Sequence, residues 1–187
     1  MKNRCSWCGN EPLYVKYHDT EWGVPQDNDQ KLFEFLTLEG AQAGLNWLTI
    51  LKKRNNYYQA FDKFNIKKIA KYNDEKIAEL MNNSGIIRNK LKILSTISNA
   101  KSFLNIQQEY GSFYLYQSQF IDNSPIVNKW KNIDQIPTSN HISDAFSKDL
   151  KKRGFKFVGT TIIYAYMQAI GMVNDHIVSC FRYKEVM

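Results

Sequence analysis

The stretch SDAFSKDLKKRGFKFVGTTIIYAYMQAIG, residues 143–171, contains two apolar periodic segments separated by a short turn. The first segment begins at Ser143 and is expected to form a helix ending at Gly154. The second, over 160–171, is apolar on nearly all sides and is expected to be a buried helix, although TTIIYAY alone also resembles a strand. Together they form a helix-hairpin-helix pattern.

The turn has features of a phosphate-binding site. Gly154 and Gly159 let a phosphate approach the backbone closely, and the free N–H groups at the start of the second helix, from Thr160, attract anions. Arg153 and Lys156 add positive charge. We therefore predict phosphate contacts from these five residues. The alternative is an ordinary corner between two helices, with a glycine cap.

Helical periodicity extends over the rest of the chain, which has only four prolines and nine glycines. Further helices are expected at 29–44, 45–54, 73–83 and 88–111. Asp29 and Asn73 are placed to cap two of them. The last carries an apolar row of Leu91, Leu94, Ile97 and Phe103. Because no strand alternation, repeat or linker is evident, the sequence predicts an all-α fold, a single compact domain over 1–187.

Composition excludes several classes of protein. Hydrophobic residues make up 43% and aromatic residues 14%, which is typical of a packed core. No signal-peptide core and no membrane-spanning run is present, so we expect a cytoplasmic protein without a membrane partner. The net charge of +7 fits a polyanion such as nucleic acid, although a general richness in lysine is the simpler interpretation.

Cysteine and histidine occur near both ends of the chain. The stretch NDHIVSC places His176 and Cys180 four residues apart, on one face if it is helical. Cys5 and His18 lie thirteen residues apart near the N-terminus. Since zinc favours four nitrogen or sulfur ligands, these four form a candidate site that joins the two chain ends.

Two alternatives to this metal site stay open at the level of spacing. Cys8 competes as a ligand, because CSWC has a ligand-type spacing. The thiols and imidazoles can also be buried and hydrogen-bonded without metal. His141 is expected to be a solvated loop histidine, and three cysteines argue against a disulfide framework.

An acidic residue stands among aromatic residues in the first half of the chain. Glu39 falls inside the apolar run LTLEGAQAG, where burial of a carboxylate needs a reason. Tyr14, Tyr17, Trp22 and Trp47 lie nearby in sequence. The alternatives are a glutamate at the solvent edge of its helix and aromatic residues that only fill the core.

Five motifs carry a resemblance in order and over nearly the whole chain: YHDTEWGVP, LEGAQAGLNWLTILKKR, GIIRNKLKI, FSKDLKKRGFKFVGTT and GMVNDHIVSC. They resemble DNA-3-methyladenine glycosylase I, a zinc-containing member of the helix-hairpin-helix glycosylases. The resemblance implies base-excision repair of double-stranded DNA that contains alkylated bases. The reaction would hydrolyse the N-glycosidic bond of 3-methyladenine, releasing free 3-methyladenine and leaving an abasic site.

The resemblance also assigns ligands. It implies one structural Zn²⁺ that clips 5–18 to 176–180, with Cys8 outside the site. The ligands that match the family pattern are Cys5, His18, His176 and Cys180. A monomer is expected.

The family's base pocket is matched by Glu39, Tyr17 and Trp47, with Tyr14 and Trp22 close by. We expect an ionised Glu39 to accept hydrogen bonds from the adenine edge and to attract the cationic base, while aromatic rings stack on it. Asn46 stands where the pattern usually has serine, which alters hydrogen bonding beside the pocket.

Three further expectations concern DNA and chemistry. Gly44 and Leu45 are candidates for an apolar wedge that fills the space left by a flipped base. Asp175 stands where many relatives of the wider class have a catalytic aspartate, but we rank a helix-capping or ligand-orienting role above catalysis. No lysine stands out as a Schiff-base nucleophile, so no strand-cleaving lyase activity is expected.

Two other function classes remain at this point. One is a zinc-stabilised DNA-binding module without catalysis, against which Glu39 within an aromatic cluster argues. The other is a zinc hydrolase for a small substrate. Four protein ligands argue against it, because they leave no open position on the metal.

Overall fold

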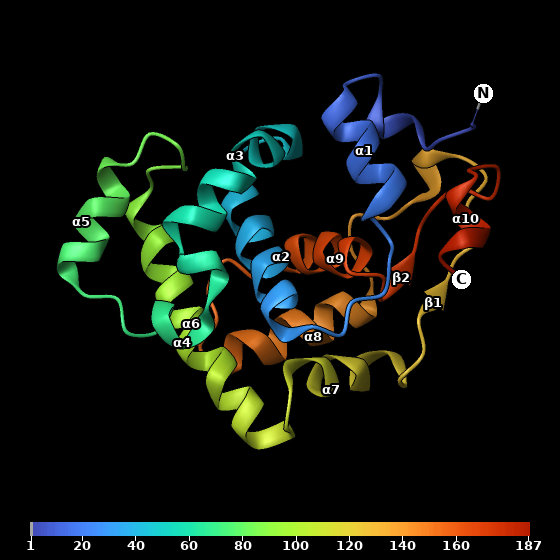
Figure 1. The fold of residues 1–187 in the computed structure, drawn as a ribbon. Helices are drawn as coiled ribbons and strands as arrows, with labels where there is room; N and C mark the ends of the chain where they lie inside the picture. The colour runs from blue at the N-terminus through green and yellow to red at the C-terminus, as the bar shows by residue number, and fades with distance from the viewer. Residues whose placement is uncertain (1) are drawn as a thin grey trace.

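The computed structural model describes residues 2–187 as helices arranged around α2 (Figure 1). The α-helices are α1 Pro12–Thr20, α2 Asp29–Gln42, α3 Trp47–Ala60, α4 Ile66–Ile69, α5 Asp74–Asn82, α6 Lys90–Tyr110, α7 Phe113–Ser118, α8 His141–Lys152, α9 Thr160–Ala169 and α10 Arg182–Glu185. The 3-10 turns are η1 Ser6–Cys8, η2 Asp62–Phe64, η3 Gln119–Ile121 and η4 Ile133–Gln135. The all-α expectation is confirmed. Within residues 2–187, no helix combines the length and apolarity needed to cross a membrane.

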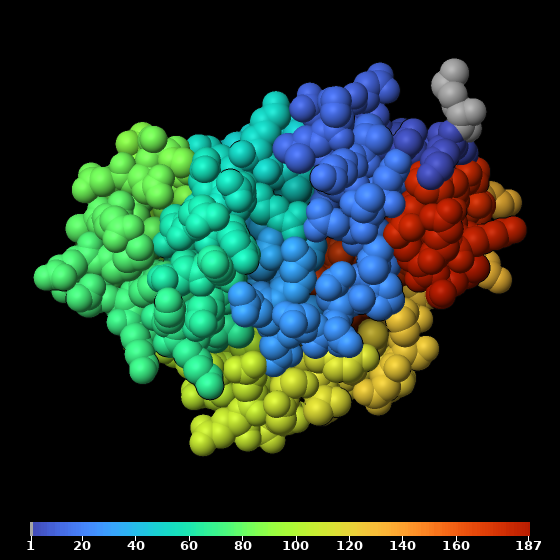
Figure 2. All heavy atoms as spheres, viewed as in Figure 1, coloured from blue at the N-terminus to red at the C-terminus, as the bar shows by residue number. Residues whose placement is uncertain are grey.

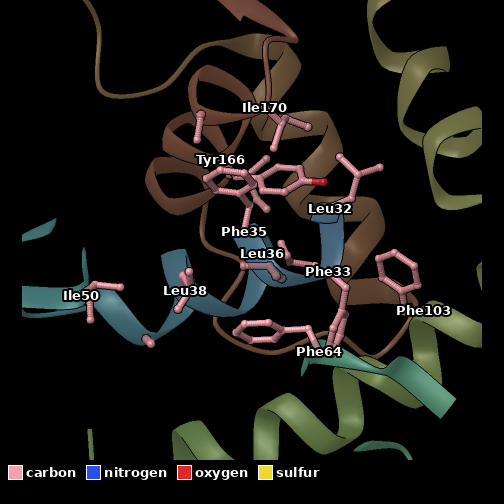
Figure 3. Close-up of a cluster of buried hydrophobic side chains, with 14 of the residues drawn as sticks. Leu32, Phe33, Phe35, Leu36, Leu38, Ile50, Phe64, Phe103, Tyr166 and Ile170 are labelled. Carbon is pink, nitrogen blue, oxygen red and sulfur yellow. The ribbon is translucent and has the colours of Figure 1, made fainter. Parts of the chain in front are cut away.

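Helix α2 forms the centre of the core. Every residue from 32 to 41 is buried, so the helix has no solvent face over this stretch. It packs against α3, α6, α7 and α9. Figure 3 shows its side chains clustered with Phe103 of α6 and with Tyr166 and Ile170 of the α9 region. A fully enclosed helix fixes its C-terminal turn, which carries Glu39, against the rest of the molecule.

Helices α8 and α9 pack on each other across the turn formed by 153–159. Helix α8 begins at His141, with the Asn140 side chain accepting a hydrogen bond from the Ser143 backbone N–H at 2.8 Å. The expected start at Ser143 is therefore wrong, since Ser143 is the third residue of the helix and its hydroxyl accepts a hydrogen bond from the Asn140 N–H. His141 lies in a helix rather than in a loop. The strand alternative for TTIIYAY is also wrong.

The capping of α2 differs from expectation. Asn28 is its N-cap and accepts from the Lys31 backbone N–H. The Asp29 carboxylate instead accepts from the backbone N–H groups of Phe113 and Tyr114, at 2.9 and 3.0 Å, and thereby caps α7. The expected cap at Asn73 is confirmed.

The apolar row expected on α6 is only half correct. Ile97 and Phe103 are buried, but Leu91 is 68% and Leu94 38% exposed. The buried face of the first turns instead carries Ile93. The reason is that α6 begins at the surface, where only one side of the helix meets a neighbouring element.

The two ends of the chain lie together. A short parallel pair joins β1, Ile126–Val127, to β2, Val173–Asn174. The Phe181 N–H donates to the Asn3 carbonyl at 2.9 Å. Figure 2 shows the C-terminal residues, in red, in contact with the N-terminal segment, in blue. The fold thus brings the two candidate ligand segments into one region.

Candidate functional site

A cavity of about 360 Å³ lies between α1, the end of α2, the start of α3, α9 and the segment 133–138. Its lining is mainly aromatic and apolar, with few polar groups. It is formed by Trp7, Tyr14, Tyr17, Trp22, Glu39, Gln42, Trp47, Ile133, Ile136, Pro137, Thr138, Thr161, Tyr164, Ala165 and Gln168. The structure therefore brings together all five residues for which the sequence predicted a base pocket.

Glu39 is the acidic group of this cavity. It is only 4% exposed, and within residues 2–187 no side chain forms a hydrogen bond or ion pair with it. Burial raises the pKa of Glu39 to about 8. At pH 7 the neutral form of this carboxyl group therefore predominates in the empty cavity. The solvent-edge alternative is wrong, because Glu39 is buried. The ionised state of Glu39 beside a cationic base stays a prediction.

The aromatic residues form a continuous wall. The Tyr17 and Trp47 rings lie 5.5 Å apart, and Trp7 contacts Tyr14 and Trp22 with 5.0 Å between ring centroids. The indole N–H groups of Trp7 and Trp47 are buried, and no described residue accepts a hydrogen bond from them. Two unpaired donors and an unpaired carboxyl beside aromatic rings that meet at tilted or edge-on angles make a site suited to a flat heteroaromatic ligand.

Trp7 is a functional candidate that sequence reasoning missed. The signal present was an aromatic residue between Cys5 and Cys8, within the segment expected to be ordered by a metal. The segment 133–138 on the opposite side of the cavity carries no comparable signal, because isoleucine, proline and threonine in a loop have no distinctive pattern.

Asp175 is a buried acceptor for four donors. Its Oδ1 accepts from Asn128 Nδ2 and Trp130 Nε1, both at 2.7 Å. Its Oδ2 accepts from the Tyr164 hydroxyl at 2.7 Å and from Gln168 Nε2 at 2.8 Å. Neither capping nor ligand orientation describes this arrangement, so the expected role is wrong. Asp175 ties two residues of the cavity wall to the segment after β1.

Four candidate metal ligands converge beside the cavity. One ligand atom from each of Cys5, His18, His176 and Cys180 lies within 4.8 Å of the others, and all four residues are buried. The Cys180 Sγ lies 3.5 Å from His18 Nε2 and from His176 Nδ1, and the Cys5 Sγ lies 3.6 Å from His176 Nδ1. These spacings resemble the edges, about 3.6 Å, of a tetrahedron of zinc ligands.

The cluster differs from the sequence prediction in one local feature. Residues 176–180 form a turn, with the Cys180 N–H donating to the Ile177 carbonyl, rather than a helix. The Cys8 Sγ donates to the Cys5 carbonyl at 3.2 Å and stays outside the cluster. The two thiols share one proton: their hydrogen bond lowers the pKa of Cys180 and raises the pKa of Cys5.

Each imidazole of the cluster has an outer partner. His18 Nδ1 lies 2.8 Å from Asp19 Oδ1, and Arg4 binds the same carboxylate. The Arg4 hydrogen bond lowers the pKa of Asp19 to about 2. His176 Nε2 lies 3.1 Å from the Trp22 carbonyl. Such partners fix the orientation of metal-binding imidazoles, and Trp22 also connects the cluster to the cavity.

Comparison with known proteins shows the family of this chain. Residues 7–183 match the methyladenine glycosylase family. The chain belongs to that family. It is 49% identical to DNA-3-methyladenine glycosylase 1 of Escherichia coli over 180 residues, covering 96% of each chain. It is 46% identical over 180 residues to a DNA-3-methyladenine glycosylase of Haemophilus influenzae, covering 96% of this chain and 97% of the relative.

Solved structures show the same glycosylase fold. A crystal structure of a 3-methyladenine DNA glycosylase I superposes with a TM-score of 0.93 at 51% identity, covering 96% of this chain and 98% of that one. The Staphylococcus aureus enzyme, whose recognition of 3-methyladenine has been studied structurally, gives a TM-score of 0.93 at 33% identity, with 96% of each chain covered. The resemblance and the fold class expected from the sequence are confirmed.

In this methyladenine glycosylase a second hollow, of about 370 Å³, adjoins the cavity. Glu39 lines both hollows, and Gly44 and Leu45 line the second alone. Gly44 has φ +77°, a conformation that favours glycine, and Leu45 is 41% exposed. An apolar side chain thus projects from a tight turn near the mouth of the cavity.

The turn between α8 and α9 presents only part of the predicted phosphate-binding set. Gly154 has φ +93°, whereas Gly159 has an ordinary φ of −61°, and a Cβ added at Gly159 would meet no atom within 4 Å. Nothing inside the protein requires glycine at 159, so the open space there suits an external group. Lys156 is exposed.

Two members of that set are engaged inside the protein. Arg153 forms ion pairs with Glu109 and Asp149 and stacks on Tyr110, so its guanidinium does not face outward as a free cation. The Thr160 hydroxyl is hydrogen-bonded to Asp144 Oδ1 at 2.6 Å. Only the backbone N–H of Thr160 remains as a candidate for an anion.

Proposed function

We propose that the cavity receives a 3-methyladenine base flipped out of double-stranded DNA, and that Glu39 and the aromatic wall promote hydrolysis of its N-glycosidic bond. The activity expected from the sequence, that of a DNA-3-methyladenine glycosylase in base-excision repair, is confirmed by family membership. The observation that carries the residue-level proposal is the buried, unpaired Glu39 carboxyl within the aromatic cavity.

Alkylation at N3 gives adenine in DNA a positive charge and weakens its bond to deoxyribose. A cation within about 4–6 Å lowers the pKa of a carboxyl group by about 1–3 units. Because the pKa of Glu39 is about 8 in the empty cavity, the cationic base would drive loss of its proton. An unmodified, neutral adenine provides no such drive. Selectivity thus follows from coupling between ionisation of Glu39 and charge on the base.

The wall adds a second source of selectivity. A cation over the face of a tryptophan or tyrosine gains about 0.5–2 kcal/mol in each contact, and neutral adenine gains less. Tyr17 and Trp47 are the proposed stacking residues, with Tyr14, Trp22 and Trp7 completing the wall. The unpaired indole N–H groups of Trp7 and Trp47 offer hydrogen bonds to acceptors on the base or the sugar.

DNA is proposed to lie across the two exposed turns. Leu45 would enter the stack at the space left by the flipped base, and Gly44 allows the tight turn that presents it. At the hairpin, Gly159 and the Thr160 N–H would contact a phosphate, with Lys156 adding charge. Gly154 shapes the turn, and Arg153 is left out of the proposed contacts because it is paired internally.

Substituting Leu45 by alanine is expected to lower the single-turnover excision rate on methylated duplex DNA about tenfold, because the unstacked state loses its apolar filler. Affinity for free 3-methyladenine should stay within about twofold, since Leu45 does not line the base cavity. Tryptophan fluorescence measures the latter. An unchanged excision rate and unchanged affinity for lesion duplex would remove Leu45 from the wedge role.

We propose one Zn²⁺ as the metal of the four-ligand cluster. Two thiolates and two imidazoles are zinc's usual donors, the ligand spacings fit a tetrahedron, and all four positions come from the protein. Because no position is left for substrate or water, the metal would be structural. It would hold 5–18 against 176–180 and so support the aromatic wall.

Asp175→Asn is expected to lower the free energy of unfolding by about 2–4 kcal/mol, because an amide nitrogen would face two donors in a buried site. Zinc content should not change. Affinity for free 3-methyladenine should fall a few-fold through movement of Tyr164 and Gln168, measured by fluorescence. A loss above about a hundredfold in single-turnover rate, with fold and zinc retained, would give Asp175 a chemical role instead.

The direct test of the proposed function is incubation of the wild-type protein with methylated duplex DNA, followed by chromatography of released bases. Free 3-methyladenine and alkali-labile abasic sites are expected, without strand cleavage before alkali. DNA binding without base release would favour a non-catalytic damage-binding module.

A further inference from the structure

Helix α6 holds the turn that carries Leu45. The Lys92 ammonium donates to the carbonyls of Ala41 and Ala43, at 2.8 and 2.7 Å. These carbonyls belong to the end of α2, where backbone acceptors lack partners within the helix and the helix dipole favours a cation. Gly44 and Leu45 follow directly. Within residues 2–187 no carboxylate forms an ion pair with Lys92, so its positive charge interacts mainly with the C-terminal end of α2.

The same helix also holds the hairpin. Asn99 accepts from the Lys156 N–H at 2.8 Å and donates to the Lys156 carbonyl at 2.9 Å, so one amide fixes both sides of that residue's backbone. The Ser102 hydroxyl donates to the Arg153 carbonyl at 2.9 Å. Lys92, Asn99 and Ser102 recur at a spacing that places them along one side of α6.

The hairpin also packs directly on the last turns of α2. A Cβ at position 40 would lie 3.3 Å from the Cβ of Phe157, a residue held at a positive φ of 54° within the hairpin. Gly40 therefore permits close packing of the hairpin on α2, one residue from Glu39. The α2 end, the hairpin and α6 thus form one rigid junction, although Gly44 and Lys156 are far apart in sequence.

We propose that α6 is a brace that sets the spacing of the two DNA-facing turns, with Lys92 as the positioning residue for the Leu45 turn and Asn99 as that for the hairpin. The inference rests on the proposed function. Neither side chain lines the base cavity. We expect Lys92 and Asn99 to affect binding of the DNA duplex while the flipped base enters the cavity. A wedge and a phosphate contact at a fixed separation fit one DNA geometry.

The primary test compares Lys92→Met with Lys90→Met. Both substitutions remove one positive charge from the same end of α6, but Lys90 is exposed and no hydrogen bond from its side chain occurs within the described residues. We expect Lys92→Met to lower single-turnover excision on duplex DNA about tenfold, with Lys90→Met within about twofold of wild type. Affinity for free 3-methyladenine should be unchanged in both, and Lys92→Arg should recover most of the rate.

A double variant separates positioning from general loss of structure. On a Leu45→Ala background, Lys92→Met should slow excision by less than about twofold, because the side chain through which it acts is already missing. Thermal unfolding and zinc content confirm that each variant is folded. Fully additive effects, a matching loss in free-base affinity, or equal rates for Lys92→Met and Lys90→Met would overturn the role of Lys92.

The role of Asn99 at the hairpin is tested by a different measurement, the binding of undamaged duplex DNA. Asn99→Asp keeps the acceptor for the Lys156 N–H but loses the donor for its carbonyl. We expect several-fold weaker binding of undamaged duplex DNA, measured by fluorescence anisotropy, with free-base affinity unchanged. Unchanged duplex binding would remove Asn99 from the proposal. If the wild-type protein releases no base, the proposed function is wrong. If the wild-type protein releases base and the Lys92 and Asn99 variants behave in the same way as wild type, only the proposed role of α6 is wrong.

Discussion

Replacing Glu39 by glutamine is expected to lower kcat/KM for excision of 3-methyladenine by at least about a hundredfold. Glutamine keeps the size of the side chain but cannot carry the negative charge that offsets the cationic base at this buried position. Zinc content and fold should be retained, because Glu39 forms no hydrogen bond or ion pair with the described residues. Single-turnover base release measures the effect.

The same residue predicts a pH dependence. In the proposed function the ionised form of Glu39 is the active form, and burial raises the pKa of Glu39 to about 8 in the free protein. Wild-type kcat/KM should therefore rise nearly tenfold per pH unit below about pH 8 and level off above it. The Glu39→Gln profile should be flat. A wild-type profile that is flat from about pH 6 to 9 would contradict the raised pKa.

The free energy of unfolding should fall as the pH rises, in the opposite direction to kcat/KM. The folded-state pKa of Glu39 lies above its unfolded value of 4.5, so the folded protein holds a proton that the unfolded chain releases. The resulting stabilisation is complete below about pH 4.5 and is lost as the pH rises to about 8. Relative to wild type, Glu39→Gln should gain roughly 3–5 kcal/mol of unfolding free energy across this window, measured by urea denaturation.

Substituting Cys180 by serine is the second change with a large expected effect. Loss of one thiolate from a closed four-ligand site should abolish stoichiometric zinc and lower the free energy of unfolding by at least about 3 kcal/mol. Excision should fall with it, because Trp22 and Trp7 pack on the His18 and His176 imidazoles. Metal analysis and thermal unfolding provide the measurements.

Cys8 supplies a matched control. It is buried and close to Cys5, but its sulfur lies outside the ligand cluster. Cys8→Ser should keep one equivalent of zinc and nearly wild-type excision. Loss of zinc in Cys8→Ser, or its retention with unchanged stability in Cys180→Ser, would mean that the ligand set is assigned incorrectly.

The sequence predicted the features that depend on residue type and on short local patterns. Glu39 stood out because a carboxylate interrupts an apolar run, and in the structure that run is buried on all sides. The four candidate ligands stood out by residue type, because cysteine and histidine are rare in this chain. Periodicity predicted α2, α3, α5, α6, α8 and α9, with Asn73 capping α5 as expected, but it did not predict α1, α4, α7 or α10.

The remainder depends on tertiary contacts that no short pattern encodes. Asp29 caps α7 far along the chain, although its place in the sequence indicated α2. The raised pKa of Glu39 is caused by its burial in the fold, which composition does not reveal. Lys92 looked like an ordinary surface lysine, and only the packing of α6 on α2 shows which carbonyls it contacts.

The complete enclosure of α2 has a consequence for synthesis on the ribosome. Its buried and mostly apolar residues 32–41 emerge early, but a main partner, α9, spans Thr160–Ala169 and emerges near the end of translation. Until α9 is synthesised, the apolar side chains of this segment lack a main packing partner, so they must remain shielded or only loosely collapsed during most of elongation. Nascent chains stalled before residue 160 should therefore bind chaperones strongly, and completed chains should be released from them.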